Sequence, residues 1–258
     1  MNPQNKKQNI SLLLLTKNEE DNIKTNFNWL KKCPNINEIV VVDDFSNDAT
    51  ISQLKKLATP NLKIKIFKRK LNNNFSQQRI FALSKTKNNR VFWLDADETP
   101  SPQLIKFLAS YNFASKNSFS FKRLDFFIGH KLKHGEPGKL KFIRFFDKRY
   151  GLFEHPVHEL WISRQPIISL SLSIYHYPHK SLSAFLQKIN YYSDIRAQEL
   201  YSQKTKTNLL QILFYPSIKF FQNYVLKLGF LDSTPGLIMA LFMSLHSFLV
   251  RAKLWQKQ

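Results

Sequence analysis

The stretch Val91-Phe92-Trp93-Leu94-Asp95-Ala96-Asp97-Glu98 begins with four apolar residues and ends with three carboxylates among four residues. A short, continuous apolar run is typical of a strand buried in a parallel sheet, whereas a half-exposed strand alternates. In open α/β sheets, ligands bind beyond the carboxyl ends of such strands. Asp95 and Asp97 are therefore candidate ligands of one divalent cation, Mg²⁺ or Mn²⁺, because both ions prefer oxygen ligands. The alternative is an acidic turn in which Asp95 caps the next segment.

Strand-like and helix-like segments alternate along the first half of the chain. Apolar runs predict strands at 10–15, 38–42, 62–67 and 91–94, of which 62–67 alternates and is expected nearer an edge. The helices predicted between and after them cover about 19–32, a segment ending near 58, 75–84, and a segment opened by Ser101-Pro102. This repetition predicts an α/β fold in which a mostly parallel sheet carries flanking helices and right-handed crossovers.

Polar residues follow three of these strands, at the edge where parallel strands end. We expect Asn18, Asp43, Asp44, Asp95 and Asp97 to converge there. Carboxylates can bind a ribose or a uracil imide, but they repel phosphate unless a cation lies between, so the set suits a nucleoside diphosphate with Mg²⁺ or Mn²⁺. The chain contains no G-x-G-x-x-G and no G-x-x-x-x-G-K-[ST] sequence, which argues against a dinucleotide oxidoreductase and a P-loop enzyme.

The charge and cysteine content restrict the partners and the compartment. The 258 residues carry a formal net charge of +21, which favours polyanions: nucleic acid, an anionic membrane surface or phosphorylated substrates. The one cysteine, Cys33, cannot form an internal disulfide, and no Cys/His cluster has zinc-site spacing. No signal peptide is visible in the first residues. We therefore expect a cytoplasmic protein.

The C-terminal part differs in composition, so the sequence predicts a main domain at 1–178 and a helical, basic and apolar region at 179–258. That region has ten Lys and Arg against three Asp and Glu. The uncharged run 233–250 approaches spanning length, but Pro235 and His246 interrupt it. We interpret it as a helical hairpin or a surface-seated helix, which predicts peripheral attachment to the anionic inner face of the cytoplasmic membrane. The alternative is an ordinary helix packed on the sheet.

Four motifs resemble a known family. They are LLLLTKNEE (residues 12–20), EIVVVDDFSNDAT, QQRIFAL and VFWLDADE. Their order and spacing are similar to those of the family 2 glycosyltransferases, which have the GT-A fold. The resemblance implies that the first loop (Thr16, Asn18, Glu19) and the second strand end (Asp43, Asp44) bind the nucleotide. It also implies that the D-x-D at Asp95 and Asp97 binds the metal, with Asp95 near the nucleotide.

The second half resembles the bacterial lipopolysaccharide core β-glycosyltransferases, which transfer glucose onto the inner core. The segments that carry this likeness are HGEPGKLKFIRFFDKRYGLFEHPVHEL, HYPHKSLSAFLQKINYYSDIRA and FFQNYVLKLGFLDSTPG. One departure is Asp232-Ser233-Thr234, where the subgroup carries Asp-Gly. The resemblance implies a metal-dependent, inverting hexosyltransferase that uses UDP-glucose or a similar UDP-sugar. Its acceptor would be a glycan or a lipid-linked saccharide of the lipopolysaccharide core or cell envelope.

An inverting transfer needs a general base, and the resemblance indicates Glu159, with Glu154 and Asp147 as alternatives. Arg79 and Arg144 are candidate diphosphate ligands, because guanidinium groups bind phosphate in a bidentate manner. Two histidines complete the candidate set. His158 is a candidate contact of the diphosphate or metal, or else a structural residue, and His134 lies in a loop that could close over the donor.

Two other functions compete with this interpretation. The net charge of +21 and the aromatic content would suit a nucleic-acid-binding protein without enzymatic activity. However, no nucleic-acid-binding motif is visible and the Phe residues fall at core spacings, so we expect no nucleic acid partner. A nucleotidyltransferase would carry a glycine-rich phosphate loop after the first strand, and LLLLTKNEE contains no glycine.

Overall fold

The computed structural model describes residues 9–110, 116–136, 138, 140–155, 159–179 and 181–258. The chain divides into two compact units. The sheet unit comprises Met1–Arg123 and Lys141–His176, and the helical unit comprises Leu124–Leu140 and Tyr177–Gln258. A compact unit need not fold by itself, so the domain division at 178/179 stays a prediction.

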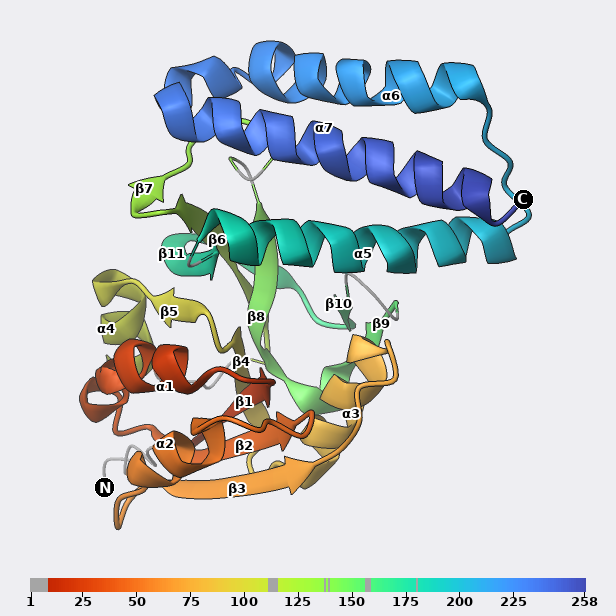
Figure 1. The fold of residues 1–258 in the computed structure, drawn as a ribbon. Helices are drawn as coiled ribbons and strands as arrows, with labels where there is room; N and C mark the ends of the chain where they lie inside the picture. The colour runs from red at the N-terminus through yellow and green to blue at the C-terminus, as the bar shows by residue number, and fades with distance from the viewer. Residues whose placement is uncertain (1–8, 111–115, 137, 139, 156–158, 180) are drawn as a thin grey trace. The chain divides into compact units, whose positions relative to one another are not determined.

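The sheet unit is built on a sheet whose first half is parallel (Figure 1). That half contains, in spatial order, β3 (Lys63–Lys68), β2 (Ile36–Asp43), β1 (Ile10–Thr16) and β4 (Arg90–Asp95). The order continues with β8 (Lys141–Asp147), β6 (Ser118–Phe127), β11 (Ile167–His179) and β5 (Glu98–Pro100), with antiparallel pairing from β4 to β8, β8 to β6 and β11 to β5. The predicted mostly parallel α/β sheet is thus confirmed, and β3 lies at its edge, as expected.

Short elements complete this pattern. The strand β7 (His130–Lys131) pairs with β6, and β9 (Gly151–Glu154) forms an antiparallel pair with β10 (Leu160–Ser163). Helices follow the parallel strands: α1 (Glu20–Asn26), α2 (Thr50–Lys56), α3 (Phe75–Lys85) and α4 (Pro102–Ser110).

The single helix predicted at about 19–32 is wrong. The chain forms α1 and then a separate 3₁₀ segment, η1 (Asn28–Lys32). Trp29 and Leu30 are both buried in η1, and the tighter winding of a 3₁₀ segment changes the direction in which successive side chains point. Packing of these two large side chains therefore overrides the helical spacing that the sequence suggested.

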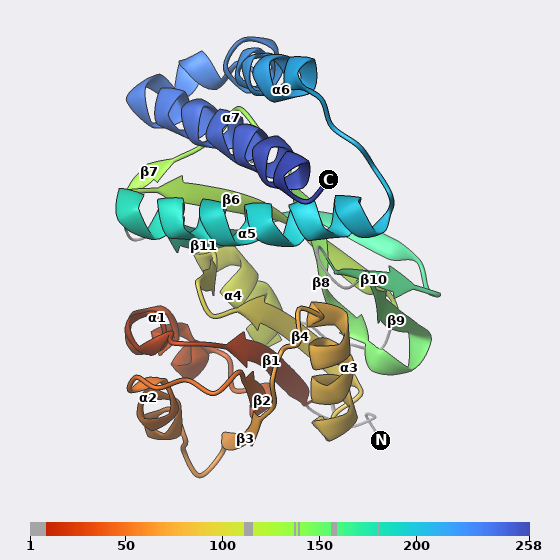
Figure 2. The ribbon, with the colours of Figure 1, turned by 45° about the vertical axis from the view of Figure 1, so that its right-hand side comes forward.

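Core side chains cover both faces of the parallel strands. Leu12, Ile39 and Phe92 lie in one apolar cluster, which Leu54 of α2 and Leu104 of α4 help to fill. The strand neighbours Leu13, Val40 and Trp93 lie in a second cluster with Ala82 of α3. Alternation of side chains along each strand produces the two clusters. Figure 2 accordingly shows α1 and α2 on one side of the parallel strands and α3 on the other.

In the described part of the helical unit there are three long helices and two short helical turns. They are α5 (Leu182–Ser202), α6 (Leu209–Phe221), the π turn η4 (Gln222–Leu226), the 3₁₀ turn η5 (Gly229–Asp232) and α7 (Ser233–Gln256). Within this unit, α7 lies between α5 and α6 (Figures 1 and 2). Because α7 is one continuous helix, the hairpin predicted within 233–250 is wrong.

One helical segment among the described residues, Gly229–Gln256, is long and apolar enough to cross a membrane by length and composition, with a mean hydropathy of 1.5. In the structure, α7 is anchored to α5 by a lysine near its end. Lys253 Nζ donates to Asn190 O at 2.8 Å and contacts Asp194 Oδ1 at 2.9 Å. These contacts hold α7 against α5 within the helical unit, but only 17% of the apolar window is buried, so the surface-seated interpretation of this region stays a prediction.

Candidate functional site

Strand register brings the predicted strand-end residues together. Thr16 at the end of β1 lies opposite Asp43 of β2, and Leu15 lies opposite Asp95 of β4. Three neighbouring parallel strands therefore end at one edge of the sheet, which we call the carboxyl rim (the ends of β1, β2 and β4). Thr16, Asp43 and Asp95 end these strands, and the other predicted ligands of the first loop, the second strand end and the D-x-D follow directly after them: Asn18, Glu19, Asp44 and Asp97.

Asp43 fixes the turn after β2. It is fully buried, and its carboxylate accepts hydrogen bonds from Thr16 Oγ1 at 3.0 Å and from the Ser46 N–H at 2.8 Å. Asn18 links the first loop to the same turn, because its N–H donates to Ser46 Oγ at 2.9 Å and its Oδ1 accepts from the Asn47 N–H at 3.0 Å. Asn18 has φ 54°, a left-handed conformation that Asn tolerates better than most residues. The two loops are thus held as one rigid support.

Asp44 and Glu19 also have partners within the chain. Asp44 accepts from the Leu71 N–H at 3.1 Å and from Lys17 Nζ at 2.7 Å. Glu19 Oε2 accepts from Asn22 Nδ2 at 2.6 Å. Asp44 is only partly buried, so its carboxylate remains accessible beside the turn.

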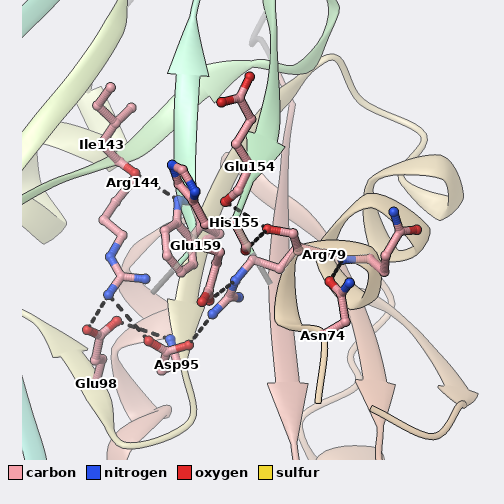
Figure 3. A network of polar contacts seen from close by, with 12 residues as sticks. Asn74, Arg79, Asp95, Glu98, Ile143, Arg144, Glu154, His155 and Glu159 are labelled. Atoms are coloured by element: carbon pink, nitrogen blue, oxygen red, sulfur yellow. Dashed lines mark hydrogen bonds and ion pairs between the residues drawn. The ribbon is translucent and has the colours of Figure 1, made fainter. Parts of the chain in front are cut away.

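Arg79 connects two carboxylates that are far apart in sequence (Figure 3). Its Nη2 donates to Asp95 Oδ1 at 2.6 Å, and its Nε donates to Glu159 Oε1 at 2.7 Å. The side chain is only 2% exposed although it carries a full charge. Arg79 lies on α3, Asp95 ends β4 and Glu159 directly precedes β10, so one buried guanidinium joins three parts of the sheet unit.

Arg144 of β8 makes a second link. Its Nη2 donates to Glu98 Oε1 at 2.5 Å and contacts Asp95 Oδ2 at 3.3 Å. The guanidinium carbons of Arg144 and Arg79 lie 3.6 Å and 3.9 Å from the centre of the Trp93 ring. The indole N–H of Trp93 donates to the Ile143 carbonyl at 2.8 Å, which fixes the ring. Aromatic contact stabilises both cations in a region from which water is excluded.

Burial and nearby charges shift the pKa values of the neighbouring carboxylates Asp95 and Glu98 in opposite directions. Burial acts to raise the pKa of Asp95, but the guanidinium groups of Arg79 and Arg144 hold this pKa well below its usual range. Burial raises the pKa of Glu98 to about 7; Arg144 opposes this rise, and the charge of Asp95 adds to it. Near neutral pH, Asp95 is therefore a carboxylate, whereas Glu98 is divided between its charged and neutral forms.

Asp97 lies beside His176, whose Nε2 is 3.5 Å from Asp97 Oδ2. His176 reaches this position because β11 pairs with β5, in the register that sets His176 opposite Glu98. Sequence reasoning did not select His176 or Glu98 as site residues. The signal for Glu98 was its place directly after the D-x-D, but nothing local indicated His176, since its pairing spans most of the chain.

The alternative bases differ in position. Glu154 is exposed, at the end of β9, where Ser76 of α3 donates to the Glu154 carbonyl at 2.8 Å. Asp147 lies opposite Arg90 in the β4–β8 pairing, at the start of β4, whereas Asp95 ends that strand. Asp147 is therefore at the wrong end of β4 to act at the carboxyl rim, and its Oδ2 is held by Arg149 at 2.6 Å.

The two histidines of the candidate set lie elsewhere. His134 belongs to the helical unit, where its Nδ1 is 2.9 Å from Asp232 Oδ1. Asp232 also accepts from the N–H groups of Lys133 and His134, so this loop is tied to the start of α7. His158 lies outside the described residues.

The residues at the rim fit a divalent cation of the Mg²⁺ or Mn²⁺ type. Asp95 is charged, its side chain is 34% exposed, and Asp97 adds a second carboxylate. No group of three or more metal-binding side chains occurs among the described residues. Two carboxylates nevertheless suffice for ions that keep water molecules and take substrate phosphates as further ligands. In the same described part of the chain, the buried Nη1 atoms of Arg79 and Arg144 have no hydrogen-bond partner, and such donors favour an anion.

Comparisons with known proteins identify a family profile, relatives and a similar fold. Residues 11–167 match the profile of glycosyl transferase family 2. An uncharacterized glycosyltransferase of Rickettsia typhi is 27% identical, over 95% of this chain and 86% of its own. A lipopolysaccharide core biosynthesis glycosyltransferase, LpsC, of Rhizobium meliloti is 24% identical, over 96% of this chain and 92% of its own. A mannosyltransferase structure from Pyrobaculum calidifontis, solved with GDP-Man and Mn²⁺, has a TM-score of 0.53 and 14% identity, covering 96% of this chain and 88% of its own.

Proposed function

The chain belongs to glycosyl transferase family 2, and we propose that it transfers a hexosyl group from a nucleoside diphosphate sugar with inversion at the anomeric carbon. The proposed donor is UDP-glucose or a similar UDP-sugar. The proposed acceptor is a hydroxyl of a glycan or lipid-linked saccharide of the lipopolysaccharide core or cell envelope. One observation carries the proposal: the guanidinium of Arg79 holds both Asp95 of the D-x-D and Glu159.

The residues divide the work of the reaction. Asp95 and Asp97 would hold Mg²⁺ or Mn²⁺, which stabilises the negative charge of a leaving diphosphate. Glu159 takes the proton of the acceptor hydroxyl, whose oxygen bonds to the anomeric carbon. The bond from that carbon to the diphosphate breaks, and its electron pair leaves with the diphosphate. A single displacement of this kind inverts the configuration.

The rim and the arginines support a nucleotide diphosphate as the leaving part of the donor. Asp43 fixes the turn after β2, and the partly exposed carboxylate of Asp44 on that turn is the acceptor for a ribose or a base imide. Arg79 and Arg144 each keep a buried N–H donor without a partner among the described residues, and a diphosphate oxygen would satisfy such donors. The name of the LpsC relative supports an acceptor in the lipopolysaccharide core.

Donor binding tests the proposal most simply. The melting temperature of the full chain is measured with UDP-, GDP-, ADP- and dTDP-sugars, with and without Mn²⁺. A ligand that binds only the native state raises the melting temperature, so one nucleotide sugar should do so in a Mn²⁺-dependent manner. Asp97→Asn should remove the Mn²⁺-dependent part. Glu199→Gln, which changes an exposed carboxylate on α5, should leave it unchanged.

The competing function predicts another result. If no nucleotide sugar raises the melting temperature with Mn²⁺, and the chain instead binds oligonucleotides with steep salt dependence, the transferase proposal is wrong for this site. The charge of +21 would then reflect nucleic acid binding.

A further inference from the structure

The helix α6 carries a broad apolar face that nothing in the described chain covers. None of its residues is buried. Its most exposed apolar side chains have exposed fractions from 52% to 68%, and they are Leu209, Leu210, Leu213, Phe214, Ile218 and Phe221. Their spacing along a helix of 3.6 residues per turn sets them on one half of its surface. An exposed apolar surface of this extent marks an interaction site.

This face is not the one that packs within the helical unit. The opposite side of α6 lies against α7, where Ser244 Oγ donates to the Pro216 carbonyl at 2.8 Å. The apolar surface continues after α6 with Val225, Leu226 and Phe230, which are 39%, 66% and 45% exposed. The packing of the unit thus leaves α6 and the two turns after it available to a partner.

The charge of the same segment is entirely basic. Residues 205–231 include Lys206, Lys219 and Lys227 but no Asp or Glu. Like charges on two copies of this segment would repel each other, which argues against a second copy of the chain as the partner. A partner with an apolar interior and a negatively charged surface would match both the apolar face and the basic charge of this segment.

A basic cavity borders the apolar face. It measures about 330 Å³ and is lined by residues of α5, α6 and α7, including Arg196, Lys219 and Arg251, with Ile218 of the apolar face on its edge. No carboxylate lines it within the described part of the chain. Arg251 stacks over Tyr215 at 4.4 Å, and among the described residues it has no ion-pair partner. Burial lowers the pKa of His246, which also lines the cavity. Arg196 is paired with Glu199 at 2.6 Å and Lys219 with Glu136 at 3.1 Å, so Arg251 is the main source of uncompensated positive charge.

We propose that α6 lies in the plane of an anionic phospholipid membrane, with its apolar face among the acyl chains and the Arg196–Lys219–Arg251 cavity around a lipid phosphate. The length of α6 excludes a span: its 13 residues extend for about 20 Å, whereas the hydrocarbon core measures about 30 Å. In-plane binding needs an apolar face, basic residues and no span, and α6 has all three. The inference holds whatever sugar donor the sheet unit uses.

The structure therefore changes the element that we expect to meet the membrane. Composition alone suggested 233–250, which forms most of α7. In the structure, α7 lies between α5 and α6 (Figure 1), and four of its residues are buried, whereas none of the residues of α6 is.

The test is co-sedimentation of the full chain with vesicles of phosphatidylcholine alone or mixed with phosphatidylglycerol. The wild type should pellet with the mixed vesicles at low salt. Leu213→Glu should reduce the partition coefficient by about tenfold or more, because it puts a charge where an exposed apolar side chain would enter the acyl chains. The matched control is Leu186→Glu on α5, at a side chain that is 44% exposed, and it should pellet like the wild type.

Two further variants test the details. Arg251→Glu should reduce the partition coefficient for mixed vesicles by about fivefold or more, with little effect on vesicles of phosphatidylcholine alone. Phe214→Trp should gain fluorescence quenching by lipids with brominated acyl chains, relative to the wild type. Ile218→Ser replaces Leu213→Glu if circular dichroism shows that the glutamate variant is unfolded.

Three results would overturn the proposal. The wild type could ignore mixed vesicles at low salt. Glycerol phosphate in solution could stabilise the chain as strongly as vesicles do, which would make the cavity a site for soluble phosphate. Sedimentation velocity could show a dimer that Leu213→Glu dissociates, in which case α6 would be an interface between copies.

Discussion

The two compact units break the usual rule of burial in opposite ways. The sheet unit encloses charge: the side chains of Arg79, Arg144 and Glu98 are between 0% and 3% exposed. The helical unit exposes apolar surface: Leu209 and Leu226 on and after α6 are 68% and 66% exposed. Charged groups are rarely buried unless paired, and large exposed apolar patches are uncommon in monomers. A bound ligand would compensate the buried charge of the sheet unit, and a bound partner would cover the exposed apolar surface of the helical unit.

The two units differ in the unfavourable free energy that remains in each: that of buried charge in the sheet unit, and that of exposed apolar surface in the helical unit. In the sheet unit, carboxylates and Trp93 compensate most of the buried charge of Arg79 and Arg144, but the Nη1 atom of each has no hydrogen-bond partner among the described residues. In the helical unit, water covers α6, and transfer of that face to an apolar phase would be favourable. Ligand binding at the first should therefore be electrostatic, and partner binding at the second mainly hydrophobic.

The largest stability effect should come from a buried arginine. Arg144→Leu leaves Glu98 buried without its partner and should lower the free energy of unfolding by about 3 kcal/mol. The loss stays at the low end for a buried pair, because Glu98 can take up a proton. The control is Arg196→Leu, which breaks the exposed Arg196–Glu199 pair and should cost about 0.5 kcal/mol or less. Urea unfolding measures both, and equal losses would remove the contrast between the two units.

Glu98 should also make stability depend on pH. Its pKa in the folded state is about 7, above the ordinary value of 4.5, so the native state holds the extra proton between these values. Its contribution is fully present below pH 4.5 and is lost as pH rises through about 7. Relative to the wild type, Glu98→Gln should therefore gain about 3 kcal/mol of unfolding free energy over that range, since one pKa unit corresponds to about 1.4 kcal/mol.

Urea unfolding of the two proteins at several pH values measures this difference. Parallel stability curves for Glu98→Gln and the wild type would show that Glu98 stays ionised in the folded protein, contrary to our account.

A smaller effect is expected at the turn before α7. Ser233 has φ 54° and ψ −141°, a conformation that favours glycine, at the position where the resembling subgroup carries Asp-Gly. Ser233→Gly should raise the unfolding free energy by about 1 kcal/mol, because it relieves backbone strain. The control Ser217→Gly, inside α6, should lower it by about 0.5 kcal/mol through helix propensity. Destabilisation by Ser233→Gly would mean that the serine hydroxyl matters more than the strain.

The sequence was sufficient to predict the parallel half of the sheet. Its strands are continuous apolar runs, and the residues after them fall at one rim because parallel strands end together. Thr16, Asp43 and Asp95 could thus be predicted to be neighbours without any structure, as the register confirms. The family, too, could be identified from the sequence, because the motifs from LLLLTKNEE to VFWLDADE resemble it and the family profile matches.

The rest of the site depends on pairings that no local pattern contains. His176 lies opposite Glu98 only because β11 pairs with β5 across more than seventy residues of chain. The two arginines resembled ordinary surface residues in sequence, since burial of a charge depends on partners supplied by distant elements. Likewise, the sequence drew attention to 233–250, but α7 lies between α5 and α6 (Figure 2), and α6 carries the more exposed apolar side chains.

The chemical step with Glu159→Gln tests the central claim most directly. Glutamine keeps the oxygen that accepts from Arg79 Nε but cannot accept the proton. We predict that single-turnover transfer falls by about 10²–10⁴-fold while the Kd of the donor changes little. The matched variant Glu154→Gln, at an exposed carboxylate on the same side of α3, should retain the wild-type rate. A weakened donor Kd with normal transfer from bound donor would contradict the account, because Glu159 would then bind the donor and the base would lie elsewhere.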